Sequence, residues 1–170
     1  MLIIRAETPV DIPAIRRVNE LAFGRPEEAK LVEKLRAAAA ITLSLVAIQN
    51  EEVVGHVVFS PVTIRAEDGS GVAAVALGPV AVLPEWQNQG VGGALIRQGL
   101  AECQGAGHEL VIVLGHRDYY PRFGFVAAAK HNIHYPQPLP EGVFMVAELQ
   151  PQALNNVRGV VHYHPAFADV

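Results

Sequence analysis

A glycine-rich turn between an apolar strand and an amphipathic helix is the sequence feature that most constrains the fold. Gly90, Gly92 and Gly93 place three glycines within four positions. The residues before the turn predict a strand over Val72–Leu83, and those after it predict a helix from about Gln89 to Gln104. Because the first N–H groups of a helix lack intrahelical partners and carry partial positive charge, this turn suits an anion such as a phosphate.

Two familiar phosphate-binding patterns fit this turn poorly. A P-loop needs Lys and then Ser or Thr after its last glycine, where this chain has Ala94 and Leu95. The dinucleotide-binding pattern needs a third small residue at the position of Leu95, and its glycines follow the strand directly, whereas Leu83–Gln89 intervenes here. A nucleotide-binding protein is therefore disfavoured. The remaining alternative to a phosphate site is a glycine-rich helix start that only packs tightly.

Composition excludes several classes of protein. The 170 residues fit one domain, and a hydrophobic content of 51% is ample for a buried core. A net charge of −4 with dispersed Lys and Arg gives no reason to expect a nucleic-acid partner. No signal peptide and no uninterrupted apolar run of about 18 residues is visible, which argues against a membrane span. The one cysteine, Cys103, fits a reducing compartment, so we expect a cytoplasmic protein. We expect it to be a monomer or a homodimer.

The periodicities along the chain predict alternating strands and helices. Strands are expected over residues 2–5, 43–49, 53–64, 72–83, 109–114, 125–130 and 144–149. Helices are expected over residues 13–23, after Pro26, over 89–104 and over 118–123. This order predicts an α+β or mixed α/β fold with a mixed sheet.

The turn also carries a family signature. Gln87-Asn88-Gln89-Gly90-Val91-Gly92 matches Gln/Arg-x-x-Gly-x-Gly/Ala, so the chain resembles the GNAT superfamily of N-acetyltransferases. The resemblance covers roughly residues 1–130, and the segment 158–167 resembles the YhbS-like branch of predicted bacterial acetyltransferases. It implies a single N-acetyltransferase domain over residues 1–170, with a core of about 1–130 and a C-terminal extension over 131–170. The implied fold is a GNAT-like mixed, mostly antiparallel sheet with a splayed central strand pair, flanked by helices.

The resemblance implies acetyl-CoA as co-substrate and no metal. The backbone of the turn would bind the pyrophosphate. Pro79 cannot donate to a sheet ladder, so it belongs at an edge, a bulge or a place where strands separate. In the family, the matching strand splays from its neighbour and pairs with the pantetheine arm. The implied cofactor-binding residues are Val80, Ala81, Val82, Gln87, Asn88, Gln89, Gly90, Val91, Gly92 and Gly93.

A second resemblance lies in His116–Phe125. The family has a tyrosine five residues before the Phe of a Gly-Phe pair, which is Tyr120 here, and its implied role is to protonate the departing thiolate. A phenol with an ordinary pKa near 10 stays protonated at neutral pH. The alternative is that Tyr119 and Tyr120 are ordinary packing residues. For the general base we choose His116, because histidine titrates near neutral pH; an exposed loop histidine is the alternative, and His56 is a weaker candidate.

The implied reaction is direct transfer of an acetyl group to an amine of a small molecule or a protein. Two other functions stay open: a non-catalytic acyl-CoA-binding or regulatory protein, and an acyltransferase with another acyl-CoA donor. Four histidines suggest a metal site at first glance, namely His131, His134, His162 and His164. The two pairs are far apart in the sequence and no cysteine accompanies them, so we expect no metal.

Overall fold

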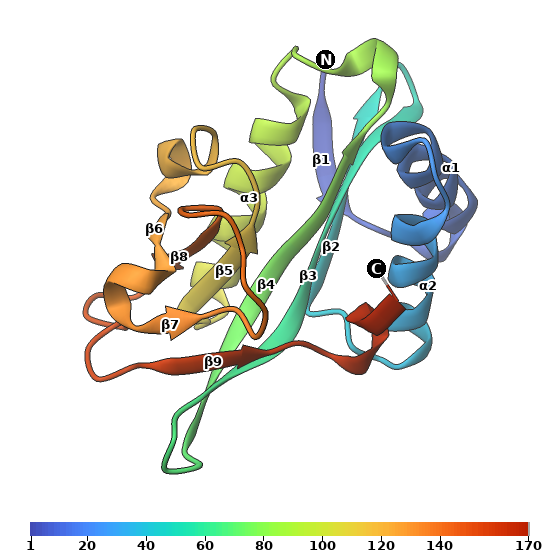
Figure 1. The fold of residues 1–170 in the computed structure, drawn as a ribbon. Helices are drawn as coiled ribbons and strands as arrows, with labels where there is room; N and C mark the ends of the chain where they lie inside the picture. The colour runs from blue at the N-terminus through green and yellow to red at the C-terminus, as the bar shows by residue number, and fades with distance from the viewer. Residues whose placement is uncertain (170) are drawn as a thin grey trace. The chain divides into compact units, whose positions relative to one another are not determined.

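The strands expected from the sequence form a mostly antiparallel sheet in the computed structural model, which describes residues 1–169 (Figure 1). Hydrogen bonding orders its main strands as β1-β2-β3-β4-β5-β8-β6. In chain order the strands are β1 (Ile3–Ala6), β2 (Leu43–Gln49), β3 (Glu52–Arg65), β4 (Gly71–Val82), β5 (Leu110–Leu114), β6 (Val126–Ala127), β7 (Ile133–His134), β8 (Phe144–Glu148) and β9 (Gly159–His162). The α-helices are α1 (Ile12–Phe23), α2 (Glu27–Ala37) and α3 (Val91–Gly105). A mixed, mostly antiparallel sheet with helices is therefore confirmed.

The chain divides into two compact units. Unit 1 comprises Met1–Ser60, Gly78–Ala101 and the C-terminal segment from Pro165. Unit 2 comprises Pro61–Leu77 and Glu102–His164. Strands β3 and β4 therefore contribute residues to both units. The expectation of a single domain over residues 1–170 stays a prediction.

In unit 1, α1 and α3 contact opposite faces of β3. Successive side chains of a strand point to opposite faces. His56 is hydrogen-bonded to Asn19 of α1, whereas Phe59 lies directly against Gly99 of α3, where any side chain would overlap the ring. Glycine at position 99 therefore lets α3 lie close to β3.

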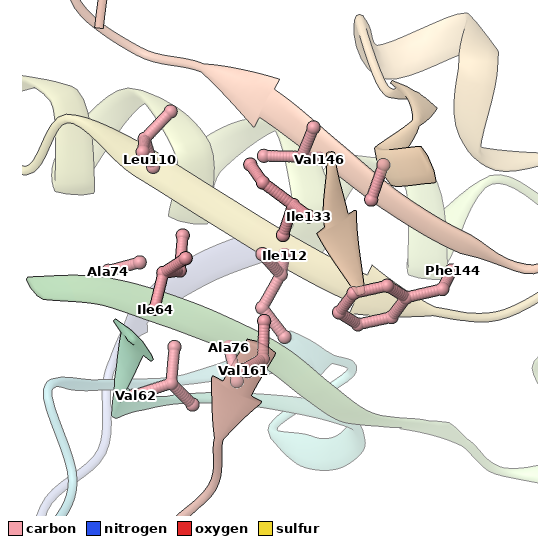
Figure 2. Close-up of a cluster of buried hydrophobic side chains, with 11 residues drawn as sticks. Val62, Ile64, Ala74, Ala76, Leu110, Ile112, Ile133, Phe144, Val146 and Val161 are labelled. Atoms are coloured by element: carbon pink, nitrogen blue, oxygen red, sulfur yellow. The ribbon is translucent and has the colours of Figure 1, made fainter. Parts of the chain in front are cut away.

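Unit 2 is built around β5, whose first four residues, Leu110 to Val113, are all buried. β4 pairs with β5 in parallel over Val75–Leu77, and β8 pairs with β5 in antiparallel orientation. β9 pairs with the end of β3, and the short strand β7 pairs with β9 in parallel. Figure 2 shows the resulting cluster, in which Ile112 of β5 lies among side chains of β3, β7, β8 and β9. These buried residues are Val62, Ile64, Ala74, Ala76, Leu110, Ile112, Ala128, Ile133, Phe144, Val146 and Val161.

Two expectations about unit 2 were wrong. The strand expected over 125–130 is limited to β6, because a 3-10 turn, η4, occupies Ala128–His131. Alanine has low strand propensity, and Asn132 ends this turn with a φ of 58°. The helix expected over 118–123 is a shorter 3-10 turn, η3 (Tyr120–Phe123), which ends at Gly124 in the left-handed conformation.

The C-terminal segment ends in unit 1. A 3-10 turn, η5 (Pro165–Asp169), follows β9, and Ala166 and Phe167 pack against the cluster of Leu31, Leu35 and Ala40. Among residues 1–169, no helix is long and apolar enough to cross a membrane.

Candidate active site

The glycine turn lies in unit 1 between a 3-10 turn, η2 (Pro84–Trp86), and α3. Gly90 has a φ of 86°, a left-handed conformation that glycine adopts without steric cost. A Cβ atom at this position would meet no heavy atom within 4 Å, so the backbone conformation, and not crowding, is what requires glycine. The predicted turn is therefore present, with Gln87, Asn88, Gln89 and Gly90 all exposed.

The start of α3 supplies backbone donors. The first intrahelical bond runs from the amide of Ala94 to the carbonyl of Gly90, at 3.0 Å. The amides of Val91, Gly92 and Gly93 come before that bond, so they have no acceptor within the helix. Three consecutive donors at the positive end of a helix dipole can bind an oxyanion without any charged side chain.

Two glutamine side chains bind the backbone of the same turn. Gln87 Nε2 donates to the carbonyl oxygen of Val82 at 3.0 Å, and Gln89 Nε2 donates to that of Glu85 at 3.0 Å. The Gln87 amide therefore ties the turn to the end of β4, and the Gln89 amide ties it to η2. The sequence placed both residues in the cofactor loop, but it carried no indication of this role.

The end of β4 is the expected pantetheine strand. Its hydrogen-bonding direction follows from Leu83, whose amide donates to the carbonyl of Val54 on β3 at 2.9 Å. Because backbone groups alternate in direction along a strand, those of Ala81 also point toward β3, whereas those of Val80 and Val82 point away from it. Of the three residues implied by the resemblance, Val80 and Val82 thus have the backbone orientation that a pairing ligand requires. The Gly78–Pro79 bond just before them is cis.

Tyr120 lies in unit 2, in a turn packed by aromatic rings. Its ring contacts Tyr119, Phe123 and Phe125, with centroid distances of 5.2, 6.2 and 5.8 Å. Gly115 leaves room for it, since any side chain there would overlap the ring. Burial, with a smaller contribution from Tyr119, raises the pKa of Tyr120 to about 12. Among residues 1–169, none makes a hydrogen bond to the Tyr120 hydroxyl.

His116 lies at the start of the same turn and is exposed. Its carbonyl accepts the amides of Tyr119 and Tyr120 at 3.1 and 3.3 Å. Tyr119 has a different environment, because the guanidinium of Arg122 lies over its ring at 4.4 Å from the centroid. His116 and Tyr120 are therefore brought together in unit 2, while the residues implied in cofactor binding are brought together in unit 1.

His56 is a fully buried core residue. Its Nδ1 lies 3.2 Å from Asn19 Nδ2 and its Nε2 lies 2.8 Å from Ser44 Oγ. An amide NH₂ can only donate, so Nδ1 is the acceptor and Nε2 carries the proton. Burial lowers the pKa of His56 to about 4. With both ring nitrogens bonded and no exposed surface, His56 is a structural histidine. No local pattern in the sequence indicated that Asn19 and Ser44 would be its partners.

Within residues 1–169, neither Cys103 nor the set of His131, His134, His162 and His164 forms a metal site. Cys103 is buried in α3, and burial raises the pKa of its thiol to about 11, so the thiolate is scarce at neutral pH. Among residues 1–169, no three His, Cys, Asp or Glu side chains are grouped so that they could hold a metal ion.

The comparisons with known proteins agree on one family. The model of the acetyltransferase (GNAT) domain matches residues 3–128. Over 167 residues, the chain is 39% identical to the uncharacterised N-acetyltransferase YhbS of Escherichia coli K12, with 98% of each chain covered.

Two solved structures extend this likeness to the fold. The structure of E. coli YhbS in complex with CoA has a TM-score of 0.92 and 38% identity, covering 98% of this chain and 92% of that one. The structure of a GNAT family acetyltransferase from Brucella melitensis in complex with acetyl-CoA has a TM-score of 0.81 and 40% identity, covering 98% of both chains.

Proposed function

Because the chain belongs to the GNAT family of acetyltransferases, we propose that it transfers the acetyl group of acetyl-CoA directly to a primary amine. The observation that carries this proposal is the glycine turn, where three backbone amides at the start of α3 have no intrahelical acceptor. The CoA and acetyl-CoA held by the two similar structures support the choice of donor.

In this proposal the pyrophosphate binds the amides of Val91, Gly92 and Gly93. Gln87 and Gln89 act indirectly, since their amides bond the backbone of β4 and of η2 and leave the amides at the start of α3 free. The amide and carbonyl of Val80, and the amide of Val82, pair with the pantetheine arm as a peptide pairs with a sheet edge. The Val82 carbonyl already accepts Gln87, but an oxygen with two lone pairs can accept a second bond.

The chemistry requires a proton to move from nitrogen to sulfur. The amine attacks the thioester carbonyl, a backbone N–H of the Val80–Val82 strand stabilises the oxyanion, and the C–S bond breaks as the amide forms. The nitrogen loses one proton and the thiolate gains one, so the overall reaction consumes none.

Tyr120 is our candidate for the acid. A phenol with a pKa of about 12 is fully protonated at neutral pH, but it is a weaker acid than a thiol with a pKa near 8.5. Complete transfer from Tyr120 to sulfur is therefore unfavourable unless the phenolate regains a proton from the amine side. We propose that Tyr120 donates a hydrogen bond to the departing sulfur and relays the proton, with His116 as the candidate base.

The test is acceptor-dependent release of coenzyme A thiol. Purified protein is assayed with acetyl-CoA and a panel of small amines, peptides with free N-termini and lysine-containing peptides. We expect saturable thiol release with at least one acceptor and calorimetric binding of coenzyme A. Absence of coenzyme A binding would overturn the proposal.

One observation favours a second candidate, a non-catalytic acyl-CoA-binding protein. His116 is exposed, and the rings that contact Tyr120 belong to the uncharged residues Tyr119, Phe123 and Phe125. Tight coenzyme A binding without turnover across the whole panel would support this candidate.

A further inference from the structure

A polar hollow of about 540 Å³ lies in unit 2, lined by residues that have no part in the proposed acetyl transfer. Three stretches line it: the tip of the β3–β4 hairpin, the end of η4 and the turn before β9. Its volume is within the range of small-molecule sites. Of its lining residues, Ile64 belongs to the buried cluster of Figure 2, whereas Lys130 and Arg158 are exposed. The hollow therefore has an apolar wall in the core and a cationic rim.

The rim is positive on a chain whose net charge is −4. Lys130 and Arg158 contribute two positive charges, and Asp68 is the one carboxylate among the lining residues. That carboxylate is engaged within the hairpin: its Oδ1 accepts the amide of Ser70 at 2.9 Å and the Ser70 hydroxyl at 2.6 Å. Asp68 therefore neutralises the rim only in part.

The two cations differ from most basic residues of this protein in making no direct hydrogen bond or close ion pair within residues 1–169. Arg5 and Arg36, for example, are ion-paired with Asp11 and Glu7 at 2.7 and 3.1 Å. Within residues 1–169, neither the guanidinium of Arg158 nor the ammonium of Lys130 makes a hydrogen bond or a close ion pair, although Arg158 lies near enough to Asp68 to help lower the pKa of that carboxyl. Their donors are therefore available to a ligand.

We propose that this hollow binds a small organic oxyanion, a molecule with an apolar body and a carboxylate or phosphate group. The guanidinium fork of Arg158 matches two oxygens of such a group, and Lys130 adds a point charge. The side-chain amides of Asn132 and Asn156, which also line the hollow, supply neutral donors. Its apolar wall, which includes Ile64 and Val72, receives the body of the ligand. This proposal does not depend on the acetyl transfer.

Calorimetric titration at constant ionic strength tests it with three probes: phenyl phosphate, benzoate and inorganic phosphate. We expect saturable binding of phenyl phosphate or benzoate, and weaker binding of inorganic phosphate, which has no apolar body. Arg158→Gln and Lys130→Gln should each weaken binding about ten-fold or more, since each removes a charge-assisted bond. Lys30→Gln, which makes the same change of charge at an exposed position on α2, is the matched control and should leave the affinity unchanged.

The glycine turn also suits phosphate, so the variants decide where a probe binds. Coenzyme A affinity is measured in parallel and should be the same in Arg158→Gln as in the unmodified protein, which separates this proposal from the proposed function. Failure of all three probes to saturate, equal affinity for inorganic and phenyl phosphate, or an unchanged affinity in Arg158→Gln would each overturn the assignment.

Discussion

His56 in unit 1 and Tyr120 in unit 2 are both titratable side chains that burial keeps uncharged, but their hydrogen bonding differs. Burial lowers the pKa of His56 to about 4 and raises that of Tyr120 to about 12. Both ring nitrogens of His56 have partners in Asn19 and Ser44, whereas no residue within 1–169 bonds the Tyr120 hydroxyl. A shifted pKa alone therefore does not identify a functional group. A buried polar atom that has no hydrogen-bond partner within the protein is the better indication, because it can bond a ligand.

The glycine turn contains both kinds of polar group, those that are already hydrogen-bonded and those that are not, within a few residues. The side-chain amides of Gln87 and Gln89 are occupied, as His56 is, while the amides at the start of α3 remain available, as the Tyr120 hydroxyl does. The variants that follow test whether the occupied groups are structural and the available ones functional.

The largest effect is expected from Tyr120→Phe, which removes the hydroxyl and keeps the ring. The acetylation kcat should fall about 1,000-fold, within the range of general-acid catalysis, while coenzyme A affinity and melting temperature stay unchanged. Tyr119→Phe is the matched control and should keep its kcat, because its ring is engaged by Arg122. An unchanged kcat in Tyr120→Phe would remove Tyr120 from the mechanism.

His56 should make the stability of the protein depend on pH. Its pKa is about 4 in the folded state and about 6.5 when unfolded, so between these values the unfolded state binds more protons and stability falls as pH falls. From pH 7.5 to 4.5 the loss should be about 2–3 kcal/mol, measured by urea unfolding. His56→Gln should lose most of this dependence, and His116→Asn should keep it. If the stability of His56→Gln changed with pH as much as that of the unmodified protein, groups other than His56 would be the cause.

Gly90→Val should weaken coenzyme A binding about 30-fold, equivalent to about 2 kcal/mol. A β-branched residue at a φ of 86° is strained, so the turn relaxes and its amides lose their direction. Gly69→Val is the matched control, since Gly69 has a φ of 88° and a Cβ atom there would likewise meet no heavy atom within 4 Å. Similar losses of coenzyme A affinity in both variants would mean that general destabilisation is responsible.

The smallest effect is expected from Gln87→Ala, about a five-fold weaker coenzyme A affinity, which corresponds to one net hydrogen bond. Gln87→Arg should restore most of the affinity, because a guanidinium can also donate to the Val82 carbonyl. If Gln87→Arg lost as much coenzyme A affinity as Gln87→Ala, the side chain would not act by bonding the Val82 carbonyl. A direct contact with the cofactor would then explain its effect.

Local sequence patterns predicted the elements that depend on local interactions. The expected strand 43–49 coincides with β2, and the expected helices match α1 and α3 within two residues. Strands β7 and β9 were not expected, because they are short and exist through pairing between distant segments, such as His134 with Val160 and Thr63 with His162. Such pairings leave no local periodicity to detect.

The same distinction applies to the candidate site. The glycine turn was identifiable because its donors belong to consecutive backbone positions. The acceptors of Gln87 and Gln89, and the partners of His56, depend on which atoms the fold brings within reach, so the sequence could not supply them. The hollow beside Lys130 and Arg158 combines three distant stretches for the same reason.

The division of the chain into two units affects how the protein folds and whether it can be cut into independently folding fragments. Unit 1 is assembled from three separate stretches and unit 2 from two. A single cut in the chain therefore releases neither unit as one continuous fragment, and each unit must close long loops before its contacts form, which slows folding. Unit 2 is complete only once His164 has been synthesised, and unit 1 only once the segment from Pro165 has followed.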